Sequence, residues 1–447
     1  MAMHPVVRGV RAILRSALRV FFRRIELRDE SRVPATGPVI FVLNHPNGLI
    51  DPVFLLCLSP RRVSFIAKST LFRMPVIGWL CRVFEALPVQ RRQDASTGTD
   101  NSDTFARARE LLGRGGTLAI FPEGISHNEP HLMPLKTGAA RIALGTRLPG
   151  LQIVPAGLFY TDKAIFRSEA LVCYGEPIAV PTAPEGEDEP SAEVVQALTD
   201  RIAAGLQAVL LEADEHEALA LALRAEEILS ASAGVESTLG DRFELRRRIV
   251  DGYRRLRREA PARVDALIAK IRGYEADLRV LGLTPAHPDP RQISSGVILQ
   301  VGARSLGLLA LLAPLALPGT LIHYPAYRLI GVLARRLSGG DADIVGTVKV
   351  LAALLLFPAS WALAGGVALW ASGSLAIGGA VLAAAPLSGL VALRFWERAA
   401  ELGAGARAAW LWIWRRSLLD RLAAERAAID AAIIELDQLL TAGPTGA

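Results

Sequence analysis

Cysteine is scarce in this chain, with three residues in 447, at positions 57, 81 and 173. They are far apart and form no Cys-x-x-Cys pair, so the sequence indicates neither a disulfide framework nor a zinc site. Such usage fits a reducing compartment. The N-terminus also lacks a charged cap followed by a long apolar core and a cleavage site, so we expect no secretory signal.

Charge is absent from a long stretch near the C-terminus, because no Asp, Glu, Lys or Arg occurs from Val350 through Leu393. Its two halves, 350–371 and 374–394, each have about 20 residues, which is enough to cross a hydrocarbon core of roughly 30 Å. Apolar residues make up 51% of the chain, and the mean hydropathy of +0.32 is high for a water-soluble protein. We therefore predict a transmembrane hairpin.

The hairpin is flanked by basic residues on both sides. Arg328, Arg335, Arg336 and Lys349 precede it, and Arg394, Arg398 and Arg407 follow it. Since positive residues concentrate on the cytoplasmic side, both ends of the hairpin and the domain that precedes it in the chain are expected there. A further apolar segment, 305–322, contains Pro314 and Pro318, so we expect it to be broken and re-entrant or in-plane.

An N-terminal segment, 6–24, carries an arginine at every third or fourth position: Arg8, Arg11, Arg15 and Arg19. Apolar residues occupy the other side, which predicts a basic amphipathic helix. Such a helix can lie in the headgroup layer of an anionic leaflet. It can equally pack on its own domain with a solvated arginine face, and the sequence leaves both alternatives open.

Composition shifts divide the rest of the chain. The proline-rich, acidic stretch 181–193 marks a flexible boundary, and long helical patterns follow it. We expect an interfacial helix over 1–28, an α/β domain over 29–180, a linker and helical region over 181–293, and a membrane-embedded region over 294–447. The arginine-rich run 246–258 has apolar residues at core spacing, so we expect no nucleic-acid partner.

The 29–180 region alternates strand and helix patterns. Apolar, β-branched runs at 39–43, 63–68, 117–121 and 151–156 read as strands, and helical patterns lie between them. This alternation predicts an α/β domain with a mixed sheet flanked by helices. Ligands of such sheets usually bind at the carboxyl ends of the strands.

The stretch Asn44–Pro52 leaves the first of these strands and combines an imidazole with a carboxylate. Pro46-Asn47-Gly48 predicts a tight turn that brings Asp51 within reach of His45. A carboxylate bonded to one ring nitrogen fixes the tautomer and makes the other nitrogen a better proton acceptor. The pair therefore has the layout of a general base with its orienting acid.

This stretch resembles the first motif of the PlsC-like glycerolipid acyltransferases, and Phe121-Pro122-Glu123-Gly124 resembles their third. The usual spacing in that family is His, four residues, Asp, whereas here it is five. The wider spacing, and the Ser126-His127 pair that follows Gly124, resemble the branch of bacterial and yeast-type glycerol-3-phosphate and dihydroxyacetone-phosphate acyltransferases. The resemblance covers about residues 20–180.

The resemblance implies roles for further residues. The stretch Phe84–Val89 with Arg91-Arg92 resembles the family's second motif. By that resemblance Arg91 would hold the acceptor's phosphate, and Lys136 would add positive charge near it. Glu123 is expected to accept hydrogen bonds from the acceptor's hydroxyls. Asn44, Gly124 and Ser126 complete the expected substrate-binding set.

Two other chemistries use the same residues. His45, Asp51, Glu123, His127 and His131 are possible metal ligands, but Pro130 interrupts the His127–His131 spacing, so no metal is expected. Ser126 as a nucleophile lacks the second glycine of a nucleophile elbow. Neither chemistry is favoured.

The resemblance predicts a membrane-bound O-acyltransferase that acts on glycerol 3-phosphate or 1-acylglycerol 3-phosphate. The acyl donor would be acyl-CoA or acyl carrier protein, and the bilayer would be a partner. No cofactor is expected, since a thioester is already activated. Two alternatives stay open: a lysophospholipid acyltransferase with another acceptor, and a non-catalytic lipid-binding membrane scaffold.

Overall fold

The computed structural model describes residues 4–90, 101–181, 190–233, 237–285, 295–339, 342–414 and 416–441. The chain divides into two compact units. The first unit contains the chain up to Glu212 together with Ala334–Val350, and the second contains Ala213–Leu333 and the chain from Leu351 onwards. The first unit is therefore built from two separate pieces of sequence.

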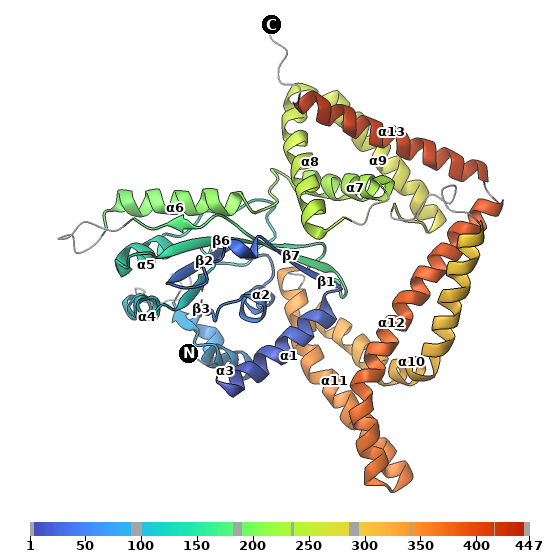
Figure 1. Ribbon diagram of the computed structural model, residues 1–447, viewed down its shortest axis with the longest axis horizontal. Helices are drawn as coiled ribbons and strands as arrows, with labels where there is room; N and C mark the ends of the chain where they lie inside the picture. The colour runs from blue at the N-terminus through green and yellow to red at the C-terminus, as the bar shows by residue number, and fades with distance from the viewer. Residues whose placement is uncertain are drawn as a thin grey trace. The chain divides into compact units, whose positions relative to one another are not determined.

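One mixed sheet forms the centre of the first unit, with strand order β1-β7-β6-β2-β5-β3-β4 and β8 paired to β6 (Figure 1). Neighbouring strands are parallel, except that β7 and β8 run antiparallel to β6. The strands are β1 (Arg24–Arg28), β2 (Val39–Leu43), β3 (Ser64–Lys68), β4 (Leu87–Val89), β5 (Thr117–Ile120), β6 (Gln152–Tyr160), β7 (Glu169–Tyr174) and β8 (Ile178–Ala179). All five residues of β2 are buried, as expected for a wholly apolar strand between parallel neighbours.

Helices cover both faces of this sheet (Figure 1). Ile40 and Val42 share a core with α4, α5 and α6 on one face. On the other face, α1 packs along α2, where the ring of Phe22 contacts those of Phe54 and Tyr160. The α-helices of this unit that precede Glu212 are α1 (Pro5–Phe21), α2 (Ile50–Leu58), α3 (Pro75–Val83), α4 (Ser102–Gly113), α5 (Gly138–Thr146) and α6 (Ala192–Gln207). The expected α/β class is confirmed.

The N-terminal helix α1 is tied to the end of α2 by two of its four arginines. Arg11 Nη2 donates to the carbonyl of Ser59 at 2.6 Å, and Arg15 Nη2 donates to that of Cys57 at 2.8 Å. These carbonyls lie at the C-terminal end of α2, where no backbone N–H of the helix remains to bond them. Arg8 and Arg19 are exposed.

The second unit contains a bundle of α7 (His216–Ala233), α8 (Leu239–Glu259), α9 (Pro261–Leu281) and α13 (Arg416–Thr441). Their apolar faces share one core, in which Ile228, Ile271 and Ile429 are fully buried. A buried ion cluster joins α7 to α8: Glu226 accepts from Arg242 Nε at 2.7 Å and from Arg246 Nη2 at 2.6 Å. The helical region expected after the α/β domain is thus confirmed.

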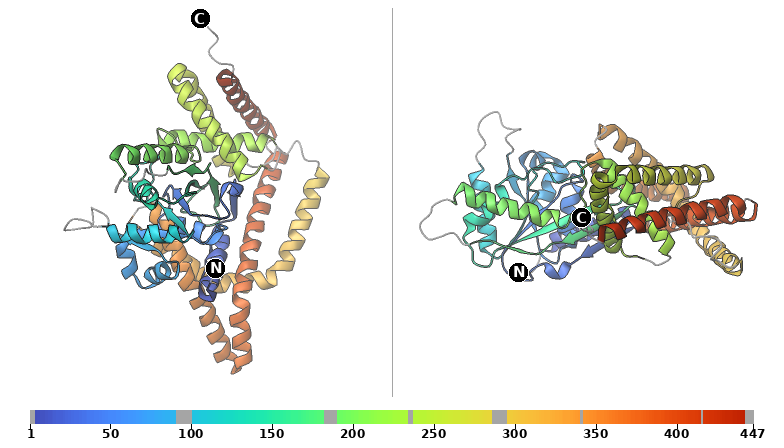
Figure 2. Two further views of the ribbon diagram at one scale, coloured as in Figure 1. Left: turned by 60° about the vertical axis from the view of Figure 1, so that its left-hand side comes forward. Right: turned by 90° about the horizontal axis from the view of Figure 1, so that it is seen from above.

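Among the residues that the structure describes, three helices are long and apolar enough to cross a membrane: α10 (Ser295–Leu337), α11 (Ala342–Ser372) and α12 (Leu375–Trp414). Figure 2 shows α11 and α12 as an antiparallel pair, joined at Gly373, which has a φ of +63°. Gly365 and Gly378 face each other across the pair, and the absence of side chains allows the close approach. These apolar helices indicate membrane association.

The helix α10 runs without interruption through Pro314, Pro318 and Pro325, whereas the sequence predicted a break in 305–322. Proline is tolerated in membrane helices where polar side chains and neighbouring helices satisfy the backbone groups it frees. Near these prolines, His323 Nδ1 bonds to the carbonyl of Gly319 at 2.7 Å, and Trp361 of α11 donates to His323 Nε2 at 2.8 Å. The membrane helices therefore share internal hydrogen bonds.

Candidate active site

The turn between β2 and α2 carries the predicted general base. Asn47 closes this turn, because its carbonyl accepts hydrogen bonds from the backbone N–H groups of Ile50 and Asp51 at 3.0 and 3.3 Å. Asp51 consequently lies in the first turn of α2 and is fully buried. The helix N-terminus favours a negative charge at this position.

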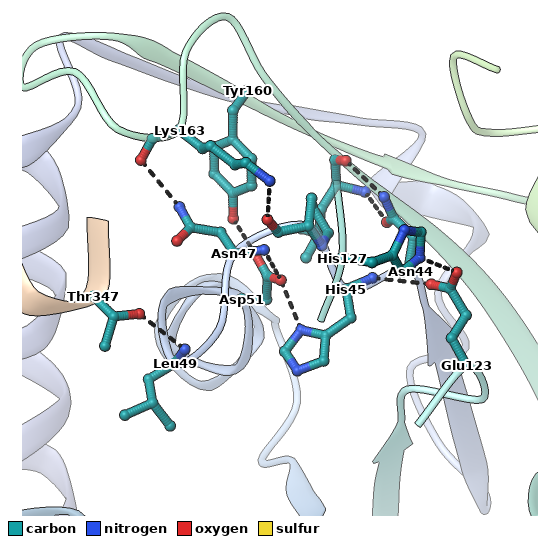
Figure 3. A network of polar contacts seen from close by, with 12 residues as sticks. Asn44, His45, Asn47, Leu49, Asp51, Glu123, His127, Tyr160, Lys163 and Thr347 are labelled. Atoms are coloured by element: carbon teal, nitrogen blue, oxygen red, sulfur yellow. Dashed lines mark hydrogen bonds and ion pairs between the residues drawn. The ribbon is translucent and has the colours of Figure 1, made fainter. Parts of the chain in front are cut away.

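His45 and Asp51 are in direct contact, as the sequence predicted. His45 Nδ1 lies 2.8 Å from Asp51 Oδ2, and the same oxygen accepts from the N–H of Asn47 at 2.7 Å (Figure 3). The ring stacks on Phe121 at 4.0 Å between centroids, which fixes its plane. Since a carboxylate only accepts, Nδ1 is the donor of this contact, and in the neutral ring Nε2 then presents a lone pair. Within the described part of the chain, Nε2 has no hydrogen-bond partner.

The second oxygen of Asp51 is held by a residue that the sequence did not single out. Tyr160, the last residue of β6, donates its hydroxyl to Asp51 Oδ1 at 2.6 Å (Figure 3). Burial, followed by the charge of Asp51 and this hydrogen bond, raises the pKa of Tyr160 well above its usual value of about 10. The phenol therefore stays protonated and remains a donor at neutral pH.

Glu123 joins the loop after β5 to the loop that carries His45. Its Oε1 accepts from the N–H of His45 at 3.2 Å, and its Oε2 accepts from the N–H of Met133 at 2.9 Å and contacts His127 Nε2. The carboxylate is almost completely buried, with 3% of the residue exposed. This geometry gives Glu123 a positioning function, and contact with an acceptor's hydroxyls stays a prediction.

The other predicted binding residues have different surroundings. Asn44 exchanges two hydrogen bonds with the backbone of Leu158 in β6, at 2.7 and 3.0 Å, so its amide ties β2 to β6. Gly124 has a φ of +75°, and an added Cβ would lie 2.5 Å from Lys136 Nζ. The exposed Lys136 ammonium thus lies over Gly124, the residue that follows Glu123.

Two predicted residues add less to this geometry. Ser126 is partly buried and follows Gly124 in the same loop. Arg91, the predicted phosphate ligand, lies outside the described residues, so its role stays a prediction. In the described ranges, no group of three or more His, Cys, Asp or Glu side chains is arranged to hold a metal ion.

Sequence reasoning missed Tyr160 and Lys163, and it gave Asn47 only a place in the predicted turn between His45 and Asp51 (the catalytic turn). Asn47 is fully buried and donates to the carbonyl of Lys163 at 3.3 Å, and Lys163 Nζ donates to the carbonyl of Pro46 at 2.6 Å. A signal for Tyr160 was present in its position at the carboxyl end of a strand. That β6 is the neighbour of β2 was not readable from the sequence.

Family models match two regions of the chain. Residues 24–158 match the model described as Acyltransferase, and residues 223–445 match the Glycerol-3-phosphate acyltransferase 2 C-terminal domain. The first region contains His45, Asp51, Glu123 and Lys136, and the second contains α10, α11 and α12.

Curated relatives include fungal and plant proteins. An uncharacterised acyltransferase of Schizosaccharomyces pombe is 27% identical over 77% of this chain and 66% of its own length. Glycerol-3-phosphate O-acyltransferase 1 of Saccharomyces cerevisiae is 28% identical over 76% of this chain and 56% of its own length. The chloroplastic 1-acyl-sn-glycerol-3-phosphate acyltransferase BAT2 of Brassica napus is 31% identical over 35% of this chain and 43% of its own length.

The chain thus spans between about half and two thirds of the length of these fungal relatives. The turn that carries His45 lies inside the first matched region, where the sequence motifs placed the resemblance. The chain therefore contains a PlsC-like acyltransferase domain, followed by a region of the glycerol-3-phosphate acyltransferase 2 C-terminal domain type.

Proposed function

We propose that this protein is a membrane-bound O-acyltransferase that moves a fatty acyl group from a thioester to a hydroxyl of a glycerol phosphate. The observation that supports this most is the contact of the His45 ring with Asp51. Its Nδ1 lies 2.8 Å from the buried Asp51 carboxylate, and its Nε2 has no hydrogen-bond partner within the described residues. A neutral imidazole held in this way can accept a proton at Nε2, which is what general-base catalysis requires.

The reaction follows from this arrangement. His45 Nε2 takes the proton of the acceptor's hydroxyl while that oxygen attacks the thioester carbonyl. The tetrahedral intermediate then collapses, the C–S bond breaks, and the imidazolium returns the proton to the leaving thiolate. Asp51 stabilises the imidazolium throughout, because it lies 2.8 Å from the protonated Nδ1. No cofactor is needed for these steps.

The acceptor is proposed to be glycerol 3-phosphate or 1-acylglycerol 3-phosphate. The relatives carry both substrate names: the S. cerevisiae protein is a glycerol-3-phosphate O-acyltransferase, and the B. napus protein is a 1-acyl-sn-glycerol-3-phosphate acyltransferase. The Ser126-His127 pair favours the first acylation. Lys136 and Arg91 would hold the phosphate, and acyl-CoA or acyl carrier protein would supply the acyl group.

The membrane arrangement is part of the proposal. We infer a multi-pass protein whose first unit lies on the cytoplasmic face, because basic residues flank the charge-free stretch of α11 and α12 on both sides. Protease accessibility of the two units in sealed inverted vesicles would test this orientation. In such vesicles the cytoplasmic face is outside. Digestion of the His45 domain only after the vesicles are permeabilised would contradict the orientation.

The experiment on function measures thioester consumption by the full-length protein in lipid nanodiscs, with a panel of glycerol-phosphate acceptors and both donor classes. His45→Ala should lower kcat by about 10²-fold or more, as expected for loss of a general base. His131→Ala removes an exposed histidine and serves as the matched control. Near wild-type turnover by His45→Ala with every acceptor would refute the mechanism, and lipid binding by the wild-type protein without turnover would favour a scaffold.

A further inference from the structure

The first turns of α11 belong to the acyltransferase unit and not to the helical bundle. Thr347, in the second turn of α11, lies against the loop that carries His45 and Asp51 (Figure 3). Its Oγ1 accepts the backbone N–H of Leu49 at 3.1 Å, across 298 residues of sequence. Thr347 is buried, with 8% of its surface exposed.

This hydrogen bond satisfies the backbone N–H of Leu49 at the start of α2, while those of Ile50 and Asp51 bond to the carbonyl of Asn47. Leu49 is the N-cap residue of α2, and its own side chain cannot cap the helix. The first N–H groups of a helix have no internal partner and need an outside acceptor. The hydroxyl of Thr347 supplies that acceptor at the end of α2 where Asp51 lies in the first turn.

Close packing beside Thr347 depends on a glycine. Gly346 is buried, and an added Cβ would lie 2.6 Å from the carbonyl oxygen of Lys163 and 3.0 Å from Asn47 Oδ1. On the next turn, Lys349 Nζ donates to the carbonyl of Ala164 at 2.6 Å. Three backbone segments, the catalytic turn, the loop after β6 and the start of α11, therefore meet at one place.

The contact reaches the reacting residues through short connections. Asn47, which Gly346 adjoins, donates its N–H to the same Asp51 oxygen that holds His45. Leu49, which Thr347 holds, is two residues from Asp51. A shift of the turn would consequently move the carboxylate relative to the imidazole ring.

We propose that Thr347 is a positioning residue for the His45–Asp51 pair, so that the start of a membrane helix completes the active site. This inference rests on the proposed function. Thr347 touches no substrate in this scheme and acts through Leu49 and the α2 N-terminus. Gly346 allows the start of α11 to lie close to the turn. Through these two residues, the position of the start of α11 determines the geometry of the His45–Asp51 pair.

The experiment compares Thr347→Val, which removes the hydroxyl while keeping the shape, with Thr347→Ser, which keeps the hydroxyl. Thr320→Val is the matched control, because Thr320 also accepts a side-chain hydrogen bond in a membrane helix, from Trp396 at 2.9 Å, but in the second unit. In nanodiscs, Thr347→Val should lower kcat about tenfold with KM for both substrates unchanged. Thr347→Ser should stay within about threefold of wild type, and Thr320→Val should match wild type.

Hydrogen–deuterium exchange on the same proteins gives a readout independent of turnover. A peptide covering residues 44–54 should exchange about tenfold faster in Thr347→Val than in Thr347→Ser or Thr320→Val. Gly346→Ala should raise exchange in this peptide and also at residues 161–164. Unchanged exchange in Thr347→Val would overturn the proposed contact.

The two readouts separate this inference from the proposed function. If the wild-type protein consumes no thioester but exchange responds as expected, the catalytic proposal fails and the contact stands as a structural one. If exchange responds but Thr347→Val and Thr347→Ser turn over equally fast, the positioning function is refuted while the acyltransferase activity stands.

Discussion

Tyr160 and Asp51 lie 109 residues apart in sequence and share a 2.6 Å hydrogen bond inside the protein. Asp51 also accepts from the ring of His45 and from the N–H of Asn47. Three donors therefore fix a carboxylate that has no exposed surface. Its orientation is set before any substrate arrives, which is the condition for efficient electrostatic support of a general base.

Replacing Tyr160 by Phe should lower kcat between three- and tenfold and leave KM almost unchanged. The ring can stay where it is, stacked on Phe22 at 5.6 Å between centroids, while Asp51 loses one of its donors. A buried acceptor that loses its partner costs about 1–3 kcal/mol, so the unfolding midpoint should also fall. Steady-state kinetics and thermal unfolding of the purified protein measure both effects.

Tyr174→Phe is the control for this substitution. The hydroxyl of Tyr174 is buried and lacks a hydrogen-bond partner in the part of the chain that the structure describes. Its removal should leave kcat unchanged and stability equal or slightly higher. If Tyr160→Phe behaves in the same way as Tyr174→Phe, the hydroxyl of Tyr160 does not orient Asp51.

Lys136→Met should raise KM for a glycerol phosphate by about tenfold and leave kcat within threefold, since the lysine is proposed to attract the acceptor's phosphate. The effect should shrink as salt is added, because salt screens exposed charges. Lys270→Met, an exposed lysine of α9, provides the control. An equal change of KM in both variants would point to a general charge effect and against a phosphate site.

Gly124→Ala should lower activity further than Lys136→Met. The φ of +75° disfavours a side chain at this position, and the new Cβ would lie 2.5 Å from Lys136 Nζ. Both the ammonium and the loop that holds Glu123 would have to move. Wild-type kinetics for Gly124→Ala would show that the ammonium need not lie over this glycine.

The second unit should lose stability in acid. Burial raises the pKa of Glu226, but the hydrogen bond from Arg242 and the charge of Arg246 outweigh it, so the pKa is lowered overall. A carboxyl group with a lowered pKa adds stability above its unfolded pKa of about 4.3, and this is lost as the pH falls through the folded value. The free energy of unfolding should therefore decline below about pH 4.5, measured by circular dichroism in detergent.

Variants of the buried ion cluster test its part in this decline. Arg246→Met leaves Glu226 buried with fewer partners, which should cost about 3–5 kcal/mol. The double variant Glu226→Gln with Arg246→Met should recover part of that loss and show a weaker acid dependence. An acid dependence equal to that of wild type in the double variant would assign the effect to other carboxylates.

The local chemistry of the catalytic turn was readable from the sequence, because His45 and Asp51 lie within one turn after an apolar strand. The partners of this turn were not. Tyr160 lies beside the turn because β6 is the neighbour of β2, and Thr347 lies there although it is 298 residues further along the chain than Leu49. Neither relationship leaves a local pattern in the sequence. For the same reason the sequence did not predict that the amide of Asn44 bonds to the backbone of Leu158 in the neighbouring strand, and its role in substrate binding stays a prediction.

The membrane end shows a similar division. The lack of charge predicted α11 and α12, since composition alone decides whether a helix suits a bilayer. The continuity of α10 through Pro314 and Pro318 was not predicted. The rule that proline ends a helix comes from helices in water and did not hold for this segment.

The first unit is assembled from residues up to Glu212 and from Ala334–Val350. During synthesis the sheet can therefore form while its last piece is still unmade, roughly 140 residues further along the chain. At about 5–20 residues per second, that piece emerges on the order of ten seconds later. Until α10 and the start of α11 have been made, the turn that carries His45 would lack the hydrogen bond from Leu49 to Thr347. A nascent or truncated chain would then hold the sheet without this contact.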